Sequence, residues 1–184
     1  NPVYPIWWQI GEGLRAHNPK ITKKEIREQA IRSLKTVGIP DAEKRIDYYP
    51  HEFSGGQKQR IVIAMALAMG ADLIIADEPT TALDVTVQAE ILALLRAIRD
   101  EYNTSILLIT HNMGVVADLA DSVAVMYRGH IIERAPAAEL FYAPIQDYTK
   151  QLLAAVPHLG QNSASVSLSD RDLDAIDTRP ALVT

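Results

Sequence analysis

The sequence contains no cysteine and has no excess of basic residues. Without thiols the chain can form neither disulfides nor thiolate metal sites, which fits a reducing compartment. Its formal net charge of -5 gives no positive field to attract a phosphate backbone, so we expect no nucleic-acid partner. The longest apolar run, residues 61–71, is well short of the roughly 18 residues typical of a membrane-spanning helix. The chain itself is therefore not expected to cross a bilayer.

The beginning of the chain lacks the pattern of a secretory signal peptide. The sequence starts at Asn1-Pro2, and no basic stretch is followed by an apolar one. We interpret this start as a cut end. The hydrophobic content, 48% of 184 residues, is that of a globular chain long enough for one ordinary domain with a core.

The first 50 residues are predicted to be helical. One helix covers residues 6–17, and a second covers 22–37, where Thr22 and Glu25 have the spacing of a capping box. Apolar residues at helical spacing predict one buried stripe on the second helix. They are Ile26, Ala30, Leu34 and Val37. Its charged residues predict a solvated outer face. They are Lys23, Lys24, Arg27 and Glu28.

Beyond Pro50 the pattern changes to short apolar runs separated by helices. The runs expected to be strands are Leu73–Ala76, Ile106–Ile109 and Val123–Met126. A helix is predicted at 85–99, between the first two strands. A strand, a helix and a strand at this spacing predict a buried parallel sheet.

The last part of the chain is predicted to contain a hairpin and two short helices. The hairpin covers 126–133 and turns at Arg128-Gly129, and the helices cover 136–141 and 147–155. From Gln161 onward, alternating serines and charges predict a linker or a mobile tail.

A pair of glycines opens the long helix predicted after Phe53, where the sequence reads Ser54-Gly55-Gly56-Gln57. As local structure this is a helix start, in which Ser54 caps the helix and Gln57 completes a capping box. The glycines add something that a cap does not need, because they let a phosphate approach the N–H groups at the positive end of the helix. The two interpretations share one geometry.

Two adjacent acids, Asp77 and Glu78, end the first strand-like run. Consecutive carboxylates at the end of a buried strand are costly unless a cation or a proton compensates one of them. In a nucleotide site Asp77 would hold Mg²⁺, directly or through its water, and Glu78 would orient and polarise the attacking water. The alternative is a strand-end pair that only caps a turn.

Asp84 and His111 are the remaining candidates. Asp84 precedes the helix that begins at Val85 and is expected to cap it, whatever other role it has. His111 follows the second strand, and ligands of open parallel sheets collect beyond the carboxyl ends of the strands. Taken alone, a histidine there is usually structural.

In combination and in order, these motifs resemble those of ABC-type ATPases, and the resemblance covers roughly residues 1–157. Ser54–Gln57 match the signature loop of that family, Asp77 and Glu78 its Walker B pair, Thr81–Asp84 its D-loop and His111 its switch histidine. The resemblance implies an α/β fold. We expect the C-terminal half of a RecA-like P-loop NTPase core with a parallel sheet, together with the ABC helical subdomain and a short C-terminal extension.

The same resemblance implies a division of the chain into four segments. The helical subdomain, with the signature loop and helix, would cover residues 1–69, and the C-terminal part of the hydrolysing core would cover 70–134. A C-terminal extension of the peptide-importer type would cover 135–160, and a linker or mobile tail would cover 161–184.

In that family two ATPase domains enclose two ATP molecules, so ATP and Mg²⁺ are the expected cofactors. The residues implied to bind nucleotide from across the interface are Ser54, Gly55, Gly56, Gln57 and Asp84. Asp77 is the implied metal ligand. Glu78 and His111 are the implied catalytic residues, with His111 contacting the γ-phosphate beside Glu78.

The phosphate loop of the family is absent, because no glycine of this sequence is followed by lysine and G-x-x-x-x-G-K-[ST] does not occur. The adenine-stacking aromatic residue and the glutamine loop are missing too, and Asn1–Tyr4 resembles the stretch just after that loop. We expect a fragment of a longer subunit that is inactive alone. A natural loss of the front half would leave the sheet without several strands and with an exposed apolar edge.

Segments after His111 resemble the ATPases of dipeptide, oligopeptide, nickel and glutathione importers. These segments are Met113–Ala117, Tyr142–Pro144, Tyr148-Thr149 and Leu152–Pro157. The implied function is ATP hydrolysis that powers uptake of peptides or a related solute at the cytoplasmic face of the cell membrane. The implied partners are a second ABC ATPase domain, two integral membrane permease subunits and, indirectly, an extracellular solute-binding protein. Residues 180–184 would be either the first strand of a second ATPase domain or an unstructured end.

Non-transport ABC ATPases are the alternative. A DNA-repair member should place a long heptad-bearing coiled coil before the signature loop, and only short helices are predicted here. A ribosome-associated member should have a basic linker, whereas this tail is acidic and rich in serine. A non-catalytic regulatory domain is disfavoured because both Glu78 and His111 are present.

Overall fold

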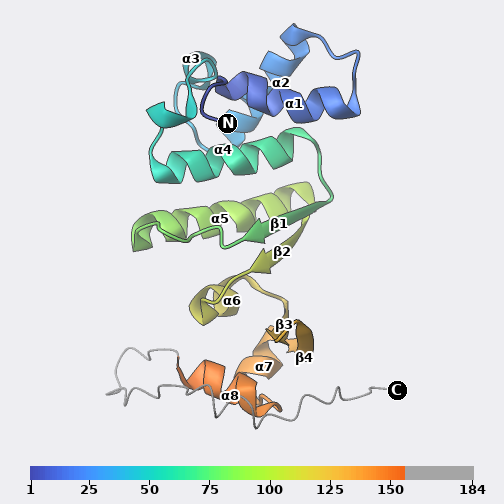
Figure 1. The fold of residues 1–184 in the computed structure, drawn as a ribbon, viewed down its shortest axis with the longest axis vertical. Coiled ribbons are helices and arrows are strands. Elements are labelled where there is room, and N and C mark those ends of the chain that lie inside the picture. The colour runs from blue at the N-terminus through green and yellow to red at the C-terminus, as the bar shows by residue number, and fades with distance from the viewer. Residues whose placement is uncertain (156–184) are drawn as a thin grey trace. The chain divides into compact units, whose positions relative to one another are not determined.

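The computed structural model describes residues 1–155, and the predicted tail and the alternatives for residues 180–184 lie outside them. The chain forms two compact units, of which the first is Asn1–Ile109 and the second begins at Thr110. Figure 1 shows the order of the elements along the chain. Within the described residues, no helix is long and apolar enough to span a membrane.

The first unit contains most of the helices. In chain order its elements are α1 (Ile6–His17), α2 (Lys23–Thr36), α3 (Ala42–Arg45), a 3₁₀ turn (Pro50–Glu52), α4 (Gly55–Ala68), β1 (Leu73–Asp77), α5 (Val85–Tyr102) and β2 (Ser105–Ile109). The predicted helices and strands are confirmed to within three residues at their ends. The short helix α3 and the 3₁₀ turn were not predicted.

Helix α2 begins as its sequence indicates. The Thr22 hydroxyl accepts a hydrogen bond from the Glu25 amide at 3.2 Å, and the Glu25 carboxylate accepts one from the Thr22 amide at 2.7 Å. The four residues of the predicted stripe are all buried, none being more than 2% exposed. The capping box and the buried stripe are therefore confirmed.

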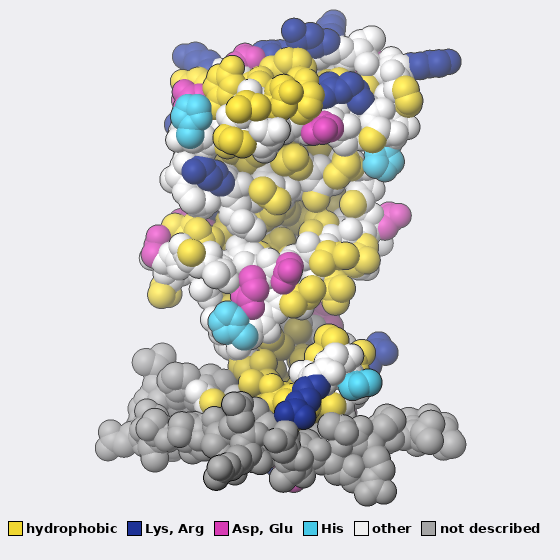
Figure 2. Space-filling view, in the orientation of Figure 1, with side chains coloured by type: hydrophobic (Ala, Val, Ile, Leu, Met, Phe, Trp, Pro, Cys, Tyr) yellow, Lys and Arg dark blue, Asp and Glu magenta, His cyan; other side chains and the backbone are white. Residues whose placement is uncertain are grey.

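The charged outer face of α2 is exposed at Lys23, Lys24 and Glu28, as predicted, and only Arg27 departs from the prediction. Arg27 is half-buried and donates two hydrogen bonds to the Asp47 carboxylate, at 2.6 and 2.7 Å. The hydrogen bond from Arg27 holds the pKa of Asp47 below its ordinary value, and the same bond raises the pKa of Arg27. Arg27 and Lys23 also lie over the Trp7 ring. Figure 2 shows hydrophobic side chains gathered over this helical end, with basic side chains around them.

Helix α5 lies between α4 and the strand pair (Figure 1), and contacts both. Arg60 of α4 joins three elements of this region. Its guanidinium donates to the Val37 carbonyl at the end of α2, at 2.8 Å, and to the Glu90 carboxylate of α5, at 2.9 Å. The first helical turns of α4 are thus tied to both of the helices between which they pack.

Strands β1 and β2 are parallel and adjacent, and α5 is the crossover between them. Their register runs from Leu73 opposite Ser105 to Asp77 opposite Ile109. The sequence predicted a buried parallel sheet, and burial is confirmed on one face only. Ile74 and Ala76 are buried against the unit, whereas Ile75 on the other face is 63% exposed. The prediction of full burial was wrong because the first unit supplies no layer to cover that second face.

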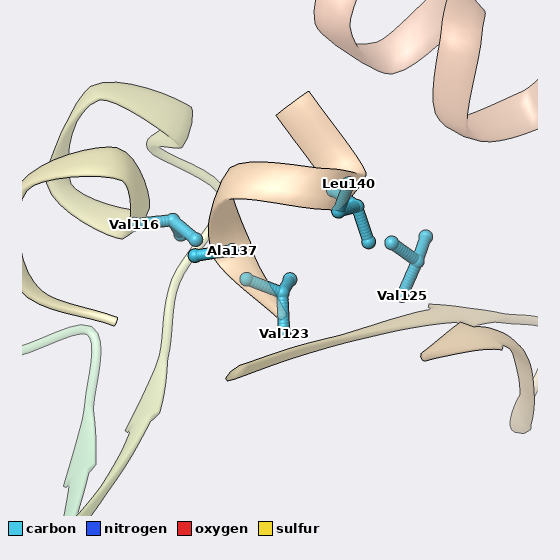
Figure 3. Close-up of a cluster of buried hydrophobic side chains, with 5 residues drawn as sticks. All are labelled: Val116, Val123, Val125, Ala137 and Leu140. Atoms are coloured by element: carbon cyan, nitrogen blue, oxygen red, sulfur yellow. The ribbon is translucent and has the colours of Figure 1, made fainter. Parts of the chain in front are cut away.

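The second unit contains α6 (Met113–Leu119), β3 (Ser122–Tyr127), β4 (His130–Pro136), α7 (Ala137–Tyr142) and α8 (Asp147–Ala154). Strands β3 and β4 form the predicted antiparallel hairpin. Its turn residues, Arg128 and Gly129, both have positive φ, at 46° and 83°, as a two-residue hairpin turn of the right twist requires. The core of this unit is an apolar cluster (Figure 3). It comprises Val116, Val123, Val125, Ala137 and Leu140.

Glu133 of β4 fixes the start of α8. Its carboxylate accepts hydrogen bonds from the amides of Ile145, at 2.7 Å, and Gln146, at 3.1 Å. Desolvation raises the pKa of this partly buried carboxyl, but the hydrogen bonds outweigh it, so that the pKa of Glu133 lies below its ordinary value. The two helices that sequence predicted after the hairpin are confirmed, at one-residue shifts of their ends.

Candidate functional site

The glycine pair stands at the start of α4, as predicted. The Ser54 hydroxyl accepts a hydrogen bond from the Gln57 amide at 3.3 Å, and the Gln57 side-chain oxygen accepts one from the Ser54 amide at 3.2 Å. The capping-box interpretation is therefore confirmed. A hydroxyl that accepts one hydrogen bond still has its proton to donate. Ser54 can thus cap its own helix and donate to an anion at the same time.

The two glycines have different surroundings. A Cβ on Gly55 would meet only the Leu83 side chain, at an ordinary contact distance of 3.6 Å. A Cβ on Gly56 would lie 2.5 Å from Cγ1 of Val87, in the first turn of α5. Gly56 is therefore required by the close packing of the starts of α4 and α5. The sequence had suggested only one reason for both glycines, the approach of a phosphate.

Asp77 is the last residue of β1, and Glu78 begins the tight turn that follows the strand. Asp77 is exposed and lies on the same face of the sheet as Ile75, because alternate residues of a strand share a face. Glu78 is half-buried, and its φ of 46° is in the left-handed region that non-glycine residues rarely adopt. The Glu78 amide donates to the Ile109 carbonyl at 2.9 Å.

The turn after Glu78 brings a hydroxyl to its carboxylate. The Thr81 hydroxyl donates to Oε2 of Glu78 at 2.9 Å, and the Thr81 amide donates to the Glu78 carbonyl at 3.2 Å. The strand-end acid therefore takes part in a turn, as the alternative interpretation expected. Turn formation uses one oxygen of the carboxylate and does not preclude a role in catalysis.

The residues present are compatible with a magnesium ion. Mg²⁺ in nucleotide sites is usually held by one or two carboxylates together with waters and phosphate oxygens. Asp77 places an exposed carboxylate at the carboxyl end of a parallel strand, where ligands of such sheets collect. The described residues contain no group of three or more potential metal ligands. Asp77 on its own would suffice only in a site completed by nucleotide and water.

Asp84 caps α5, as its position predicted. Its carboxylate accepts a hydrogen bond from the Val87 amide at 2.9 Å. The connection between Thr81 and Asp84 is held by a second turn, in which the Leu83 amide donates to the Thr80 carbonyl at 3.2 Å. Ala82 adopts a φ of 63° in this turn. A short, hydrogen-bonded loop therefore links the carboxylates of Asp77 and Glu78 to the start of α5.

His111 lies in the second unit, in the exposed link between β2 and α6. The residues on either side of it are hydrogen-bonded to each other, because the Asn112 amide donates to the Thr110 hydroxyl at 3.1 Å. The Asn112 side chain caps α6 by accepting from the amides of Gly114 and Val115. The expected contact of His111 with a γ-phosphate beside Glu78 stays a prediction.

Sequence reasoning missed three residues that shape this region. Thr81 was assigned only to a loop, although its spacing of three from Glu78 is that of a turn closed by a side chain. Arg60 and Val87 left no local signal, because each acts on a residue far away in the sequence. Only packing of α4 on α5 brings those pairs together.

Comparison with known proteins shows which family the chain resembles. Residues 9–81 match the ABC transporter family. The dipeptide transport ATP-binding protein DppD of Bacillus subtilis (strain 168) is 50% identical over 170 residues, which are 92% of this chain and 50% of that protein. The oligopeptide transport ATP-binding protein OppD of the same strain is 49% identical over 184 residues, or 100% of this chain and 49% of that protein. The chain spans about half the length of these curated relatives.

Solved structures agree in fold. A protein of Clostridium perfringens, described as part of the ABC transporter complex cbiONQ, superposes with a TM-score of 0.64 and 33% identity, over 76% of this chain and 54% of that one. An ATP-binding cassette in a post-hydrolysis state, bound to ADP and Pi, gives 0.63 and 25%, over 74% of this chain and 58% of that one. The chain is similar in sequence to ATP-binding proteins of the ABC transporter family and has the fold of an ABC ATPase cassette.

Proposed function

We propose that this chain is the signature and hydrolysis part of an ATP-binding subunit that powers a peptide importer. One observation carries the proposal. The Walker B pair, the D-loop and the start of the signature helix are all held in one compact unit, where Gly56 packs on the helix that Asp84 caps. The names of relatives at about 50% identity supply the solute class, peptides. Residues 1–69, 70–134, 135–160 and 161–184 are proposed as its four segments.

In this proposal Glu78 is the general base. A water attacks the γ-phosphorus of ATP, the new bond forms as the bond to the leaving ADP oxygen breaks, and the proton of the water passes to the Glu78 carboxylate. A magnesium ion held by Asp77, directly or through a water, would neutralise charge on the phosphate oxygens. His111 would hold the γ-phosphate beside Glu78.

The signature loop would serve the nucleotide of a second ATPase domain. Gly55 and Gly56 present backbone N–H groups at the first turn of α4, where the helix dipole favours an anion. Ser54, just before that turn, would contact the γ-phosphate with them, and Gln57, within the turn, would also bind the nucleotide. Asp84 would act across the same interface. The cradle for this chain's own nucleotide would come from polypeptide that carries the phosphate loop, which these 184 residues lack.

The remaining parts of the proposal follow the family. Two integral membrane permease subunits would dock on the helical segment, and a solute-binding protein outside the membrane would deliver the peptide to them. The assembly would place this chain at the cytoplasmic face of the cell membrane. Support for dimeric and permease-bound assemblies comes from relatives described as dimeric or as part of a transporter complex.

The test is Glu78→Gln in an ATP-binding subunit that joins these residues to a phosphate loop. We expect ATP binding to be retained and hydrolysis to fall by at least about 100-fold, because the base is lost while its shape is kept. Turnover is measured by phosphate release, and binding by a fluorescent ATP analogue. A wild-type rate in the variant would show that Glu78 is not the base. Purified alone, the 184-residue chain serves as the blank and should show no turnover.

A further inference from the structure

The main chain of Glu78 is held in a strained conformation. Its φ of 46° is unfavourable for any residue with a side chain. Strain of this kind persists only where surrounding contacts enforce it, and it concentrates at functional sites. Here the enforcing contact is the hydrogen bond from the Glu78 amide to the Ile109 carbonyl, 2.9 Å long, at the end of the neighbouring strand β2. The backbone of Glu78 is therefore fixed by the sheet.

The side chain of Glu78 is held from the other direction. The Thr81 hydroxyl donates to Oε2 of Glu78 at 2.9 Å, and the Thr81 amide donates to the Glu78 carbonyl at 3.2 Å. Pro79 is the second residue of this turn, and its ring fixes φ near −65°. Thr81 is thus tied to Glu78 through both its backbone and its side chain. These two hydrogen bonds restrict rotation of the Glu78 carboxylate.

We propose that Thr81 is the positioning residue for Glu78, with its hydroxyl holding one carboxylate oxygen so that the group meets the attacking water in the orientation needed for proton transfer. The inference rests on the proposed function, because it needs Glu78 to be the base. Thr81 itself takes no proton and contacts no nucleotide. Loss of this hydrogen bond would remove one restraint on rotation of the carboxylate about its terminal bond, and a larger fraction of its orientations would miss the water.

The experiment measures kcat and KM for ATP in the assembled ATPase that contains this segment. Thr81→Val removes the hydroxyl and keeps the branched shape, whereas Thr81→Ser keeps the hydroxyl. Thr86→Val is the matched control, because Thr86 is exposed in the first turn of α5 and the chemical change is the same. We expect Thr81→Val to lower kcat about 10- to 100-fold with KM within about threefold. Thr81→Ser and the control should stay within about threefold of wild type.

A merely structural role predicts a different result. Thr81 is exposed, so the valine should fold, and Thr81→Ala repeats the test if it does not. In a Glu78→Gln background, Thr81→Val should cause no further loss, because the two residues act as a unit. A wild-type kcat for Thr81→Val, or a Thr81→Ser enzyme as slow as Thr81→Val, would overturn the inference. If Glu78→Gln itself turns over normally, the proposed function fails instead.

Discussion

Replacing Gly55 and Gly56 one at a time with alanine should show which of the two glycines is needed for the packing of α4 on α5. In Gly56→Ala the new methyl would lie 2.5 Å from Cγ1 of Val87. Ordinary contacts between carbon atoms are about 3.5–4.0 Å, so α4 and α5 would have to separate by about 1 Å. A valine in a helix has one strongly preferred rotamer and cannot swing its methyl aside without strain. The clash therefore has to be absorbed by the helix pair.

The magnitude follows from two opposing effects. Overpacking of a well-packed contact costs about 1–3 kcal/mol. Alanine in a helix gains up to about 1 kcal/mol over glycine. We expect Gly56→Ala to lower the free energy of unfolding by about 1–2 kcal/mol. Gly55→Ala meets only an ordinary contact, at 3.6 Å, and should change the free energy of unfolding by no more than about 0.5 kcal/mol.

The assay is urea unfolding followed by tryptophan fluorescence. The sequence has two tryptophans, Trp7 and Trp8, and both lie in the first unit. Their emission therefore reports the unit that contains the glycines. A double-mutant cycle with Val87→Ala should recover about 1 kcal/mol or more of the loss caused by Gly56→Ala. Equal stability of the two glycine variants, or no recovery with Val87→Ala, would refute the packing argument.

Two further outcomes are expected from the same unit. Ala82→Gly should raise the free energy of unfolding by up to about 1 kcal/mol, because φ at this position is 63° and only glycine adopts that region without strain; an unchanged urea midpoint would contradict it. The Arg27 hydrogen bonds lower the pKa of Asp47, so their stabilisation is complete above the unfolded pKa near 3.9 and is lost as pH falls through the lower folded value. Asp47→Asn should therefore cost less than about 1 kcal/mol at pH 7, since the pair is partly exposed, and progressively less as the pH falls below the unfolded pKa; a cost that does not change with pH would refute the linkage.

The sequence alone determined the structures that depend on neighbours three or four residues apart. Thr22, Ser54 and Asp84 each accept a hydrogen bond from the amide three residues on, so that spacing and residue type were enough to predict the helix starts. The hairpin turn at Arg128-Gly129 was predictable for the same reason. The motif order also led to the ABC family, which the comparisons confirm.

Only the tertiary structure decided which distant residues meet. The contact of Gly56 with Val87 and the ion pair of Arg60 with Glu90 join positions about 30 residues apart. Neither leaves a periodic signal in the sequence, because each depends on how closely α4 and α5 pack. The exposure of one face of the β1–β2 pair was also decided by the tertiary structure. An apolar run predicts burial, but whether a second layer covers the strand is decided by the rest of the fold.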